Sequence, residues 1–254
     1  MALAFAPFGV AGAEPVQAAA AVSAVSAVDE LPPEQGVSDT VVNLAGWIVA
    51  THDNQGYPFA IMDKAAAQVL VFSPDGRLRG AAPGLFGSAI GDHTIKGIAG
   101  LALRDIPAKD RTTPPGRFVG GFGPSVGGGK LLWVDYDSAV AMHPIAEVPG
   151  EKRDERLASP TPDDNRITNG CINVSPEFYE TVLSPTFKAG GVFYVLPDKT
   201  PLSKVFPDFV KALSPKAAEV SAPEEEDQAG SADPSQKVTK RVQKPARQKA
   251  VANP

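Results

Sequence analysis

The sequence predicts a mostly β protein of the β-rich α+β class, with a few short helices and disordered segments at both ends. Glycine and proline are abundant, at 24 and 25 of 254 residues, which favours turns and short strands over long helices. From Tyr57 onward, short apolar runs are separated by turn sequences. The hydrophobic content of 43% is ordinary for a globular chain, and the length allows one domain plus tails.

Composition divides the chain into four segments. Residues 1–13 are apolar and small, and Ala11-Gly12-Ala13 resembles a signal-peptide cleavage site, although no basic residue precedes it. We therefore expect a secretory signal and an exported protein, periplasmic or envelope-associated; the alternative is a disordered leader of a cytosolic protein. The other segments are a disordered linker, a folded domain and a disordered charged tail, at residues 14–38, 39–213 and 214–254.

Charge is segregated along the tail. Residues 224–227 are acidic, whereas no acid follows Asp233 and six basic residues lie between Lys237 and Lys249. A solvated tail is the simpler interpretation, and a weak electrostatic tether to an anionic envelope surface is the alternative. The formal net charge of −5 argues against nucleic-acid binding, and no apolar run reaches the roughly eighteen residues of a transmembrane segment.

Periodicity and turn residues predict the elements of the domain. A helix is expected over 40–51, capped by Ser38 or Asp39, and a second helix begins at Ser175-Pro176. The turn Ser73-Pro74-Asp75-Gly76 predicts a hairpin, because proline presets φ and glycine supplies positive φ. Strands are predicted over 59–62, 68–72, 77–81, 131–142 and 192–196.

Two loops in the domain carry charged residues. Gly84–Gly100 is rich in glycine and contains Asp92 and His93. For His93 the alternatives are an active-site role and a solvated loop, and we favour the loop because nothing nearby completes a site. Glu147–Asn165 is a charged loop that contains proline.

Cys171 is the only cysteine, and it follows the turn pair Asn169-Gly170. A lone cysteine is most often a small buried hydrophobe. Here polar neighbours on both sides place the sulfur at the boundary of an element, where a thiolate can be exposed and backbone N–H groups can converge on a substrate oxygen.

A cysteine nucleophile needs a base and a group that orients the base. Of the three histidines, His143 stands at the end of a predicted strand, 28 residues before Cys171, where a side chain can enter a site. A neutral imidazole can take the thiol proton or hold it in an ion pair. No acid nearby is an obvious orienting group, so a main-chain carbonyl is expected in that role.

At these residues the chain resembles the L,D-transpeptidase (YkuD-type) catalytic domain. That family's signature is a histidine, a spacer and Ser/Thr-His-Gly-Cys-hydrophobic-Asn/Arg, matched here by His143 and by Thr168–Asn173. The stretch Thr113–Phe118 is similar to the family's Thr-Pro-x-Gly-x-Phe. The resemblance covers roughly residues 55–198 and implies a β-sandwich with a Cys/His site in a cleft.

The resemblance also implies roles for individual residues. Such enzymes attack the third residue of a peptidoglycan stem peptide, release terminal D-alanine and pass the thioester to an amine, giving a cross-link or an anchored protein. Cys171 would be the nucleophile, His143 the general base, and the backbone of Gly170, with that of Cys171, part of the oxyanion hole. Substrate contacts are expected at Thr168, Arg166 and Asn173. No metal or organic cofactor is expected.

Two departures from the family pattern bear on function. Asn169 replaces the family's second histidine, and it cannot carry a proton. The spacer is lengthened by the segment Glu151–Asp164, called the insertion below, which we interpret as a lid or as part of acceptor selection. Arg166 is expected either to bind a substrate carboxylate or to pair with Asp163 or Asp164.

Two alternatives to the transpeptidase stay open. In the first, water resolves the thioester and the protein is a peptidoglycan peptide hydrolase. In the second, the fold is a wall-binding module without activity, which would agree with Asn169. A working site predicts that the pKa of the Cys171 thiol is depressed, whereas an inert remnant predicts an ordinary or buried thiol.

Overall fold

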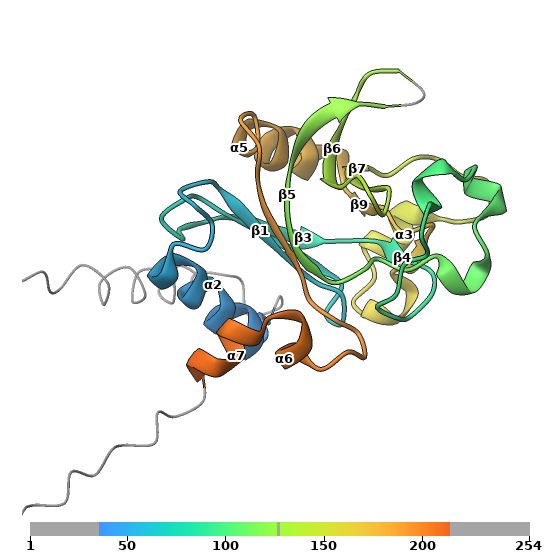
Figure 1. The fold of residues 1–254 in the computed structure, drawn as a ribbon. Coiled ribbons are helices and arrows are strands. Elements are labelled where there is room, and N and C mark those ends of the chain that lie inside the picture. Colours follow the sequence, from blue (N-terminus) through green and yellow to red (C-terminus); the bar gives the residue numbers. More distant parts are fainter. Residues whose placement is uncertain (1–35, 126–127, 214–254) are drawn as a thin grey trace, which may run out of the picture. The chain divides into compact units, whose positions relative to one another are not determined.

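The computed structural model describes residues 36–125 and 128–213 (Figure 1). These residues belong to the first of two units in the chain, Met1–Pro215. The predicted signal segment, most of the linker and the charged tail lie outside the described residues. Among the helices described, none is long and apolar enough to cross a bilayer.

Eight strands form one mixed sheet in the order β3-β2-β1-β10-β5-β6-β7-β9, and β4 and β8 pair separately. β1 runs parallel to β10, and β7 runs parallel to β9, whereas the other pairs of the large sheet are antiparallel. The strands are β1 (Phe59–Asp63), β2 (Gln68–Phe72), β3 (Leu78–Pro83), β4 (Phe86–Gly87), β5 (Gly116–Pro124), β6 (Lys130–Asp135), β7 (Val140–Pro144), β8 (Arg166–Thr168), β9 (Ile172–Val174) and β10 (Gly191–Val195).

The long strand β5 joins two halves of this sheet. Its first half, Gly116–Gly120, pairs with β10, and its second half, Gly121–Pro124, pairs with β6. A Cβ on Gly120 would overlap the carbonyl oxygen of Trp133, so only glycine lets the two strands approach at this point. The change of partner therefore falls where β5 has no side chain.

The two faces of the sheet are covered by different helices. One core cluster draws on both halves, with Met62, Phe193, Leu132 and Ile172 among its members, and Phe187 packs into it from the helical segment after β9. The second cluster lies on the opposite face over β1, β2 and β10, with Leu78 and Ala81 of β3 packed against it, and α2 and α7 cover the sheet there (Figure 1). The same face over β6, β7 and β9 carries no residue of that second cluster.

Local sequence explains the helix ends. Ser38 caps α2 by accepting a hydrogen bond from the Val41 N–H, as expected from the sequence. Ser175 caps α4 in the same way through the Phe178 N–H, and Pro176 occupies the first helical position. The helices are α2 (Asp39–Thr51), α3 (Arg153–Leu157), α4 (Pro176–Phe178), α5 (Ser184–Thr186), α6 (Leu202–Val205) and α7 (Pro207–Leu213).

Short turns of other helical types complete the domain. A π-helical turn continues α4, and 3₁₀ turns occupy the loop between β4 and β5 and the end of the insertion. They are η2 (Ile98–Gly100), η3 (Leu103–Asp105), η4 (Ala108–Asp110), η5 (Pro162–Asp164) and η6 (Tyr179–Leu183).

The mostly β fold class with a few short helices is confirmed, and the two predicted helices and most predicted strands are present, whereas α3, α6 and α7 were not predicted. One prediction is wrong: residues 131–142 are not a single strand. They form the hairpin of β6 and β7, because residues 136–139 turn and Ala139 adopts a positive φ of 54°. The apolar run continues through the turn, so hydrophobicity alone did not reveal it.

Candidate active site

Strand pairing brings the cysteine stretch beside His143. In the parallel register of β7 and β9, His143 lies next to Asn173 and Met142 next to Ile172. Met142 and Ile172 face the core, so His143 and Asn173 face the other side, and Cys171, two residues before Asn173, starts on that same side. Strand spacing and rise put the Cα atoms of Cys171 and His143 roughly 8 Å apart. The two predicted catalytic residues therefore share one sheet face, and over these strands Arg153 of the insertion, rather than α2 or α7, contacts that face at Asn173.

The His143 imidazole is oriented through Nδ1. Nδ1 lies 2.8 Å from the carbonyl oxygen of Pro144, so it carries the proton and donates. Nδ2 of Asn173 lies 3.0 Å from Nε2 and 3.4 Å from Nδ1, so this amide lies over the ring and leaves the Nε2 lone pair free of it. The expected main-chain carbonyl thus orients the ring. Burial lowers the pKa of His143, and the positive charge of Arg153 lowers it further against the opposing effect of the Pro144 carbonyl.

The Cys171 thiol is half-buried and points along β7. Sγ lies 3.7 Å from the carbonyl oxygen of Ala139, and among the described residues no hydrogen bond joins it to His143. Burial raises the pKa of Cys171, although the N–H of Ala141 and the charge of Arg153 act in the opposite direction. The thiol therefore lacks, in this arrangement, the depressed pKa expected of a working thiolate.

The turn before Cys171 is held by the hydroxyl group of Thr168, a residue of the turn itself. Thr168 Oγ1 accepts from the Gly170 N–H at 3.1 Å and donates to the Cys171 carbonyl oxygen at 2.6 Å. Gly170 has φ of 129°, and a Cβ there would lie 2.8 Å from the Thr112 carbonyl oxygen, so glycine is required. Thr168 is only 3% exposed. The N–H predicted for the oxyanion hole is thus already bonded inside the turn.

Thr113, from the upstream Thr-Pro stretch, supports this turn from the other side. Its hydroxyl donates to the Gly170 carbonyl oxygen at 2.8 Å and accepts from the Gly87 N–H at 3.0 Å. Thr113 is fully buried. One hydroxyl therefore fixes the peptide unit between Gly170 and Cys171 against strand β4.

A buried lysine holds Thr113, and the sequence analysis missed it. Lys64 Nζ donates to the Thr113 carbonyl oxygen at 2.7 Å and lies 3.0 Å from Asp92 and 3.2 Å from Asp198. The Lys64 side chain has no exposed surface, and the Asp92 side chain is 4% exposed. Backbone N–H groups and Lys64 hold the pKa of Asp92 well below its usual range against the effect of burial.

Arg166 belongs to the same buried cluster of charges. Its guanidinium binds Asp198 in a bidentate pair, at 3.1 and 2.5 Å, and donates to the Lys64 carbonyl oxygen at 2.9 Å. The neighbouring acids that the sequence offered as partners do not pair with it. Asp198, which lies 32 residues further along the chain, thus occupies the guanidinium donors of Arg166 that were expected to bind a substrate carboxylate.

Asn169 and Asn173 lie in different surroundings. Asn169 is half-buried in the turn, and its side chain makes no hydrogen bond with another described residue. Asn173 is fully buried, and its Oδ1 accepts from Arg153 Nη1 at 2.7 Å. Arg153 comes from α3 in the insertion, so this segment places a positive charge beside both candidate catalytic groups. Sequence analysis found the insertion but not this residue.

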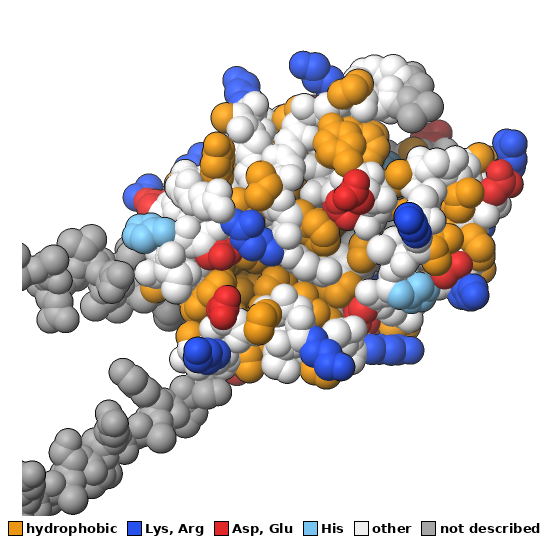
Figure 2. Space-filling model, in the orientation of Figure 1, with side chains coloured by type: hydrophobic (Ala, Val, Ile, Leu, Met, Phe, Trp, Pro, Cys, Tyr) orange, Lys and Arg blue, Asp and Glu red, His pale blue; other side chains and the backbone are white. Residues whose placement is uncertain are grey.

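Trp133 lies in the same row of the sheet as the cysteine. It pairs with Ala141, which neighbours Cys171 in the next step of the register. Its ring stacks on Tyr136 with centroids 4.5 Å apart, and Tyr136 is 53% exposed. Acidic, basic and hydrophobic side chains are interspersed on the face drawn in Figure 2, without a large patch of one charge.

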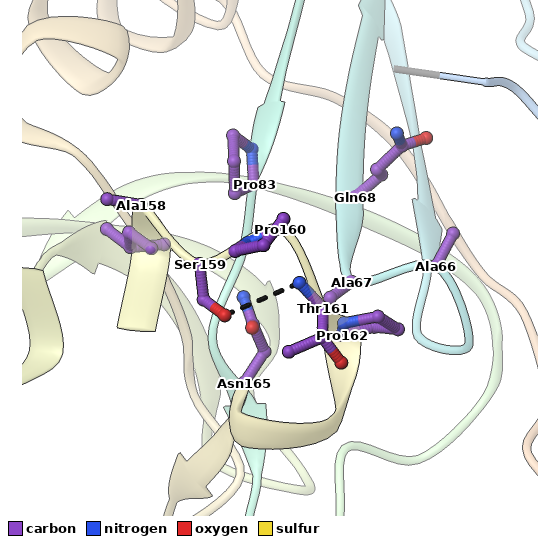
Figure 3. A pocket seen from close by; sticks show the side chains of 11 residues that line it. Ala66, Ala67, Gln68, Pro83, Ala158, Ser159, Pro160, Thr161, Pro162 and Asn165 are labelled. Atoms are coloured by element: carbon purple, nitrogen blue, oxygen red, sulfur yellow. Dashed lines mark hydrogen bonds between the residues drawn. The ribbon is translucent and has the colours of Figure 1, made fainter. Parts of the chain in front are cut away.

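A pocket of about 460 Å³ lies under the insertion and does not include Cys171 or His143. Figure 3 shows alanine and proline side chains around it, with Asn165 at one side and the hydrogen bond from the Thr161 N–H to Ser159 Oγ. Asn165 donates to the Gly84 carbonyl oxygen through Nδ2, and its Oδ1 has no partner among the described residues. Among those residues, no three His, Cys, Asp or Glu side chains are grouped to hold a metal ion.

The chain was compared with known proteins. No family model and no curated protein matches it. Among solved structures it is similar to an L,D-transpeptidase (Yku) from Stackebrandtia nassauensis, at 14% identity and a TM-score of 0.34, over 71% of this chain and 77% of that one. It is also similar to a mutant of the helical cell shape determining protein Pgp2 from Campylobacter jejuni, at 14% identity and a TM-score of 0.37, over 67% and 58% of the two chains. Likenesses this low carry no argument about function, which rests on the chain's own residues.

Proposed function

We propose that the protein is a cysteine-dependent L,D-transpeptidase that acts on peptidoglycan stem peptides. The observation that carries the proposal is the pairing of β7 with β9, which brings the Cys171 stretch beside His143, behind a turn that requires Gly170. A nucleophile, a base and a shaped turn are the parts that acyl transfer through a thioester needs.

In the proposed reaction, the Cys171 sulfur attacks the carbonyl carbon of the third stem residue while His143 Nε2 takes the thiol proton. The tetrahedral intermediate then collapses, and terminal D-alanine leaves as an amine that receives this proton. An acceptor amine attacks the thioester and gives its proton to His143, which passes it to the departing Cys171 sulfur, so that the thiol and the neutral imidazole are restored. The N–H of Cys171 is the donor proposed for the oxyanion, because that of Gly170 is bonded to Thr168.

The test is mass spectrometry of the purified protein incubated with a disaccharide-tetrapeptide, beside Cys171→Ala and His143→Gln. The proposal expects D-alanine release and cross-linked dimers from the unaltered protein, neither product from Cys171→Ala, and a large loss of rate in His143→Gln. D-Alanine release without dimers would instead establish the hydrolase. Absence of both products and of any adduct on Cys171 would reject the enzyme.

A wall-binding module without activity is the second candidate. The raised pKa of Cys171 favours it, as does the contact of Cys171 Sγ with the Ala139 carbonyl oxygen, since no hydrogen bond joins the thiol to His143 among the described residues. It predicts that Cys171→Ala sediments with purified peptidoglycan as well as the unaltered protein does, and that neither protein changes the wall chemically.

Export and envelope association are part of the proposal. They are supported by the leader at residues 1–13 and by the basic end of the tail, which could bind an anionic envelope surface. Fractionation of cells that express the full chain tests both: recovery of the intact leader in the cytosol would reject export.

A further inference from the structure

Two aromatic side chains form a stack on the sheet face that carries Cys171. The rings of Trp133 and Tyr136 lie with their centroids 4.5 Å apart and their planes 24° from parallel. Among the described residues, neither ring belongs to a core cluster or packs against one. Tyr136 is 53% exposed and Trp133 is partly buried, so Tyr136 is the outer ring of the stack. The fold thus leaves a large aromatic surface in contact with water beside the candidate active site.

The strands beneath the stack hold it in place. The Trp133 indole N–H donates to the Pro124 carbonyl oxygen at 3.1 Å. A Cβ on Gly123 would overlap the Tyr136 hydroxyl group and lie 2.9 Å from Cδ1 of Trp133, so the rings can lie against β5 only because this residue is glycine. A surface that is already ordered loses little conformational entropy when a ligand binds to it.

The sheet surface next to the stack is apolar and carries few side chains. On this face of β5, Val119 is 65% exposed, and the next two positions are Gly121 and Gly123. Hydrophobic side chains lie over β5 and β6 in Figure 2. This strip has far fewer residues than the roughly 20–30 that each partner contributes to a stable protein–protein interface, so its size fits a small ligand.

The polar groups beside the stack favour a neutral ligand that has hydroxyl groups. Asp135 and Asp137 flank Tyr136 in the chain, and neither carboxylate is in an ion pair with another described residue. Their charge disfavours an anion, and their oxygens can accept hydrogen bonds from hydroxyl groups. The negative face of an aromatic ring attracts C–H groups. A pyranose ring offers both, because it has C–H groups on its faces and hydroxyl groups at its rim.

The distance from the stack to the cysteine matches the length of a stem peptide. Trp133 and Cys171 lie two strand spacings apart in one row of the sheet, about 10 Å between their Cα atoms. Three extended residues span at most about 10–11 Å. A stem peptide whose third carbonyl carbon meets Cys171 therefore reaches back to the stack, where the sugar that carries it begins.

We propose that Trp133 and Tyr136 form a carbohydrate-binding subsite beside the candidate active site, which stacks on the sugar ring that carries the stem peptide. Tyr136 contacts the ring, and Trp133 supports Tyr136 from below. The assignment of this sugar to peptidoglycan rests on the proposed function, whereas the binding of a pyranose ring to the stack does not.

The first test uses a sugar without a peptide. NMR follows the indole N–H signals of the ¹⁵N-labelled full chain during titration with chitotriose, a trimer of N-acetylglucosamine. The Trp133 signal, identified by its absence in Trp133→Phe, should shift until it saturates. The Trp47 signal should stay fixed, because Trp47 packs on Phe209 over the other half of the sheet. No shift of Trp133 would overturn the proposal, and a shift with choline but none with the sugar would also overturn it, because the stack would then be a cation site.

Substitutions of Tyr136 locate the binding surface. Tyr136→Ala should lose most of the shift, whereas Tyr136→Phe keeps the ring and should retain it. Tyr57→Ala is the matched control, because Tyr57 is also exposed, at 44%, but lies in the turn before β1. It should bind the sugar as the unaltered protein does. Equal losses in Tyr136→Ala and Tyr57→Ala would overturn the assignment to the stack.

The second test separates the subsite from the proposed function. In Cys171→Ala, which lacks the nucleophile, binding of a disaccharide-tetrapeptide is compared with binding of the free tetrapeptide. Adding Tyr136→Ala should weaken the first by about 2- to 10-fold and leave the second unchanged. Equal weakening of both ligands would overturn the subsite. A protein that binds chitotriose at the stack but neither binds nor processes the disaccharide-tetrapeptide would reject the proposed function and retain sugar binding.

Discussion

At the scale of single residues, the site depends on hydroxyl groups that hold backbone atoms. Thr113 is the clearest, because its one hydroxyl serves both Gly170 and Gly87. Thr113→Val keeps the shape of the side chain but leaves two buried backbone groups without a partner, so the free energy of unfolding should fall by about 1–3 kcal/mol. Urea denaturation measures this, and Thr113→Ser, which keeps the hydroxyl, should lose clearly less. Equal stability of the Val and Ser variants would contradict the assigned role.

The raised pKa of Cys171 gives a second prediction at this scale. A raised pKa means less thiolate at any given pH, so the rate of reaction with iodoacetamide should follow a pH profile displaced to the alkaline side of a cysteine peptide's. Since the chain has one cysteine, the reaction reports this site alone. The same protein unfolded in urea should react faster at pH 7.5. A folded protein that reacts faster than its unfolded form would show a depressed pKa instead.

Sequence reasoning found the candidate residues that a local motif or a position at a strand end identifies. Cys171, Gly170 and His143 stand in a motif or at the end of a strand, and the structure brings them to one face. Lys64 and Arg153 were missed, because their partners lie 49 and 20 residues away and only pairing of distant segments brings them together. A lysine in a turn and an arginine in a charged loop look like ordinary solvated residues until the fold is known.

At the scale of elements, two glycines give opposite predictions. Gly46 lies inside helix α2 with nothing within 4 Å of a new Cβ, so Gly46→Ala should stabilise the fold by about 0.5–1 kcal/mol. Gly120 lies in β5 where a Cβ would meet the Trp133 backbone, so Gly120→Ala should destabilise it by at least about 1–3 kcal/mol. Thermal unfolding compares the two variants. A neutral Gly120→Ala would mean that β5 and β6 can separate without cost.

Element types were easier to predict than their ends. Ser38 and Ser175-Pro176 carry their own capping chemistry, so both helix starts could be predicted. The turn between β6 and β7 has no glycine or proline, and the bend depends on Ala139 at positive φ. The pattern of apolar residues continues through it, which is why the two strands were predicted as one.

At the scale of the whole domain, a buried cluster of charges links the loop between β4 and β5 and the segment after β10 to the candidate site. Its members are Lys64, Asp92, Asp198 and Arg166. Lys64→Met would leave the carboxylates of Asp92 and Asp198 buried with one cation between them. We expect a loss of about 3–5 kcal/mol in the free energy of unfolding, measured with urea at pH 7. Lys204→Met, on the surface of α6, is the control and should change little.

The pH dependence of this cluster has a definite sign. The pKa values of Asp92 and Asp198 are lowered in the folded protein, so their contribution to stability is complete above the ordinary value of 3.8 and declines as pH falls below it. Unfolding measured from pH 7 to pH 2 should therefore show a loss that begins near pH 4. In Asp92→Asn that acid-dependent loss should be smaller, and an identical loss would exclude Asp92 as its source.

The position of Cys171 in the same row of the sheet as Trp133 can be tested by fluorescence. The Cα atoms of the two residues are two strand spacings apart, about 10 Å. The other tryptophan, Trp47, packs on Phe209 of α7, over the half of the sheet formed by β1, β2 and β10. A fluorescent acceptor attached to Cys171 should quench tryptophan emission mainly from Trp133. Trp133→Phe should remove most of the energy transfer and Trp47→Phe should leave most of it. The reverse result would place the cysteine on another face.

The parallel pairing of β7 and β9 has a topological consequence. Adjacent parallel strands cannot be joined by a tight turn, so the chain must leave one end of the sheet and return to the other by a crossover of a dozen residues or more. The stretch from Ile145 to Cys171 is that crossover, and the partners at its two ends, His143 and Asn173, are set by the strands rather than by its length. The strand register therefore does not depend on the length of the crossover, so residues can be added or removed there, away from the contacts of Arg153 and Arg166, while the register is kept. Replacing the middle of this crossover with the corresponding segment of another protein would therefore keep His143 and Cys171 in place while changing the loop beside them.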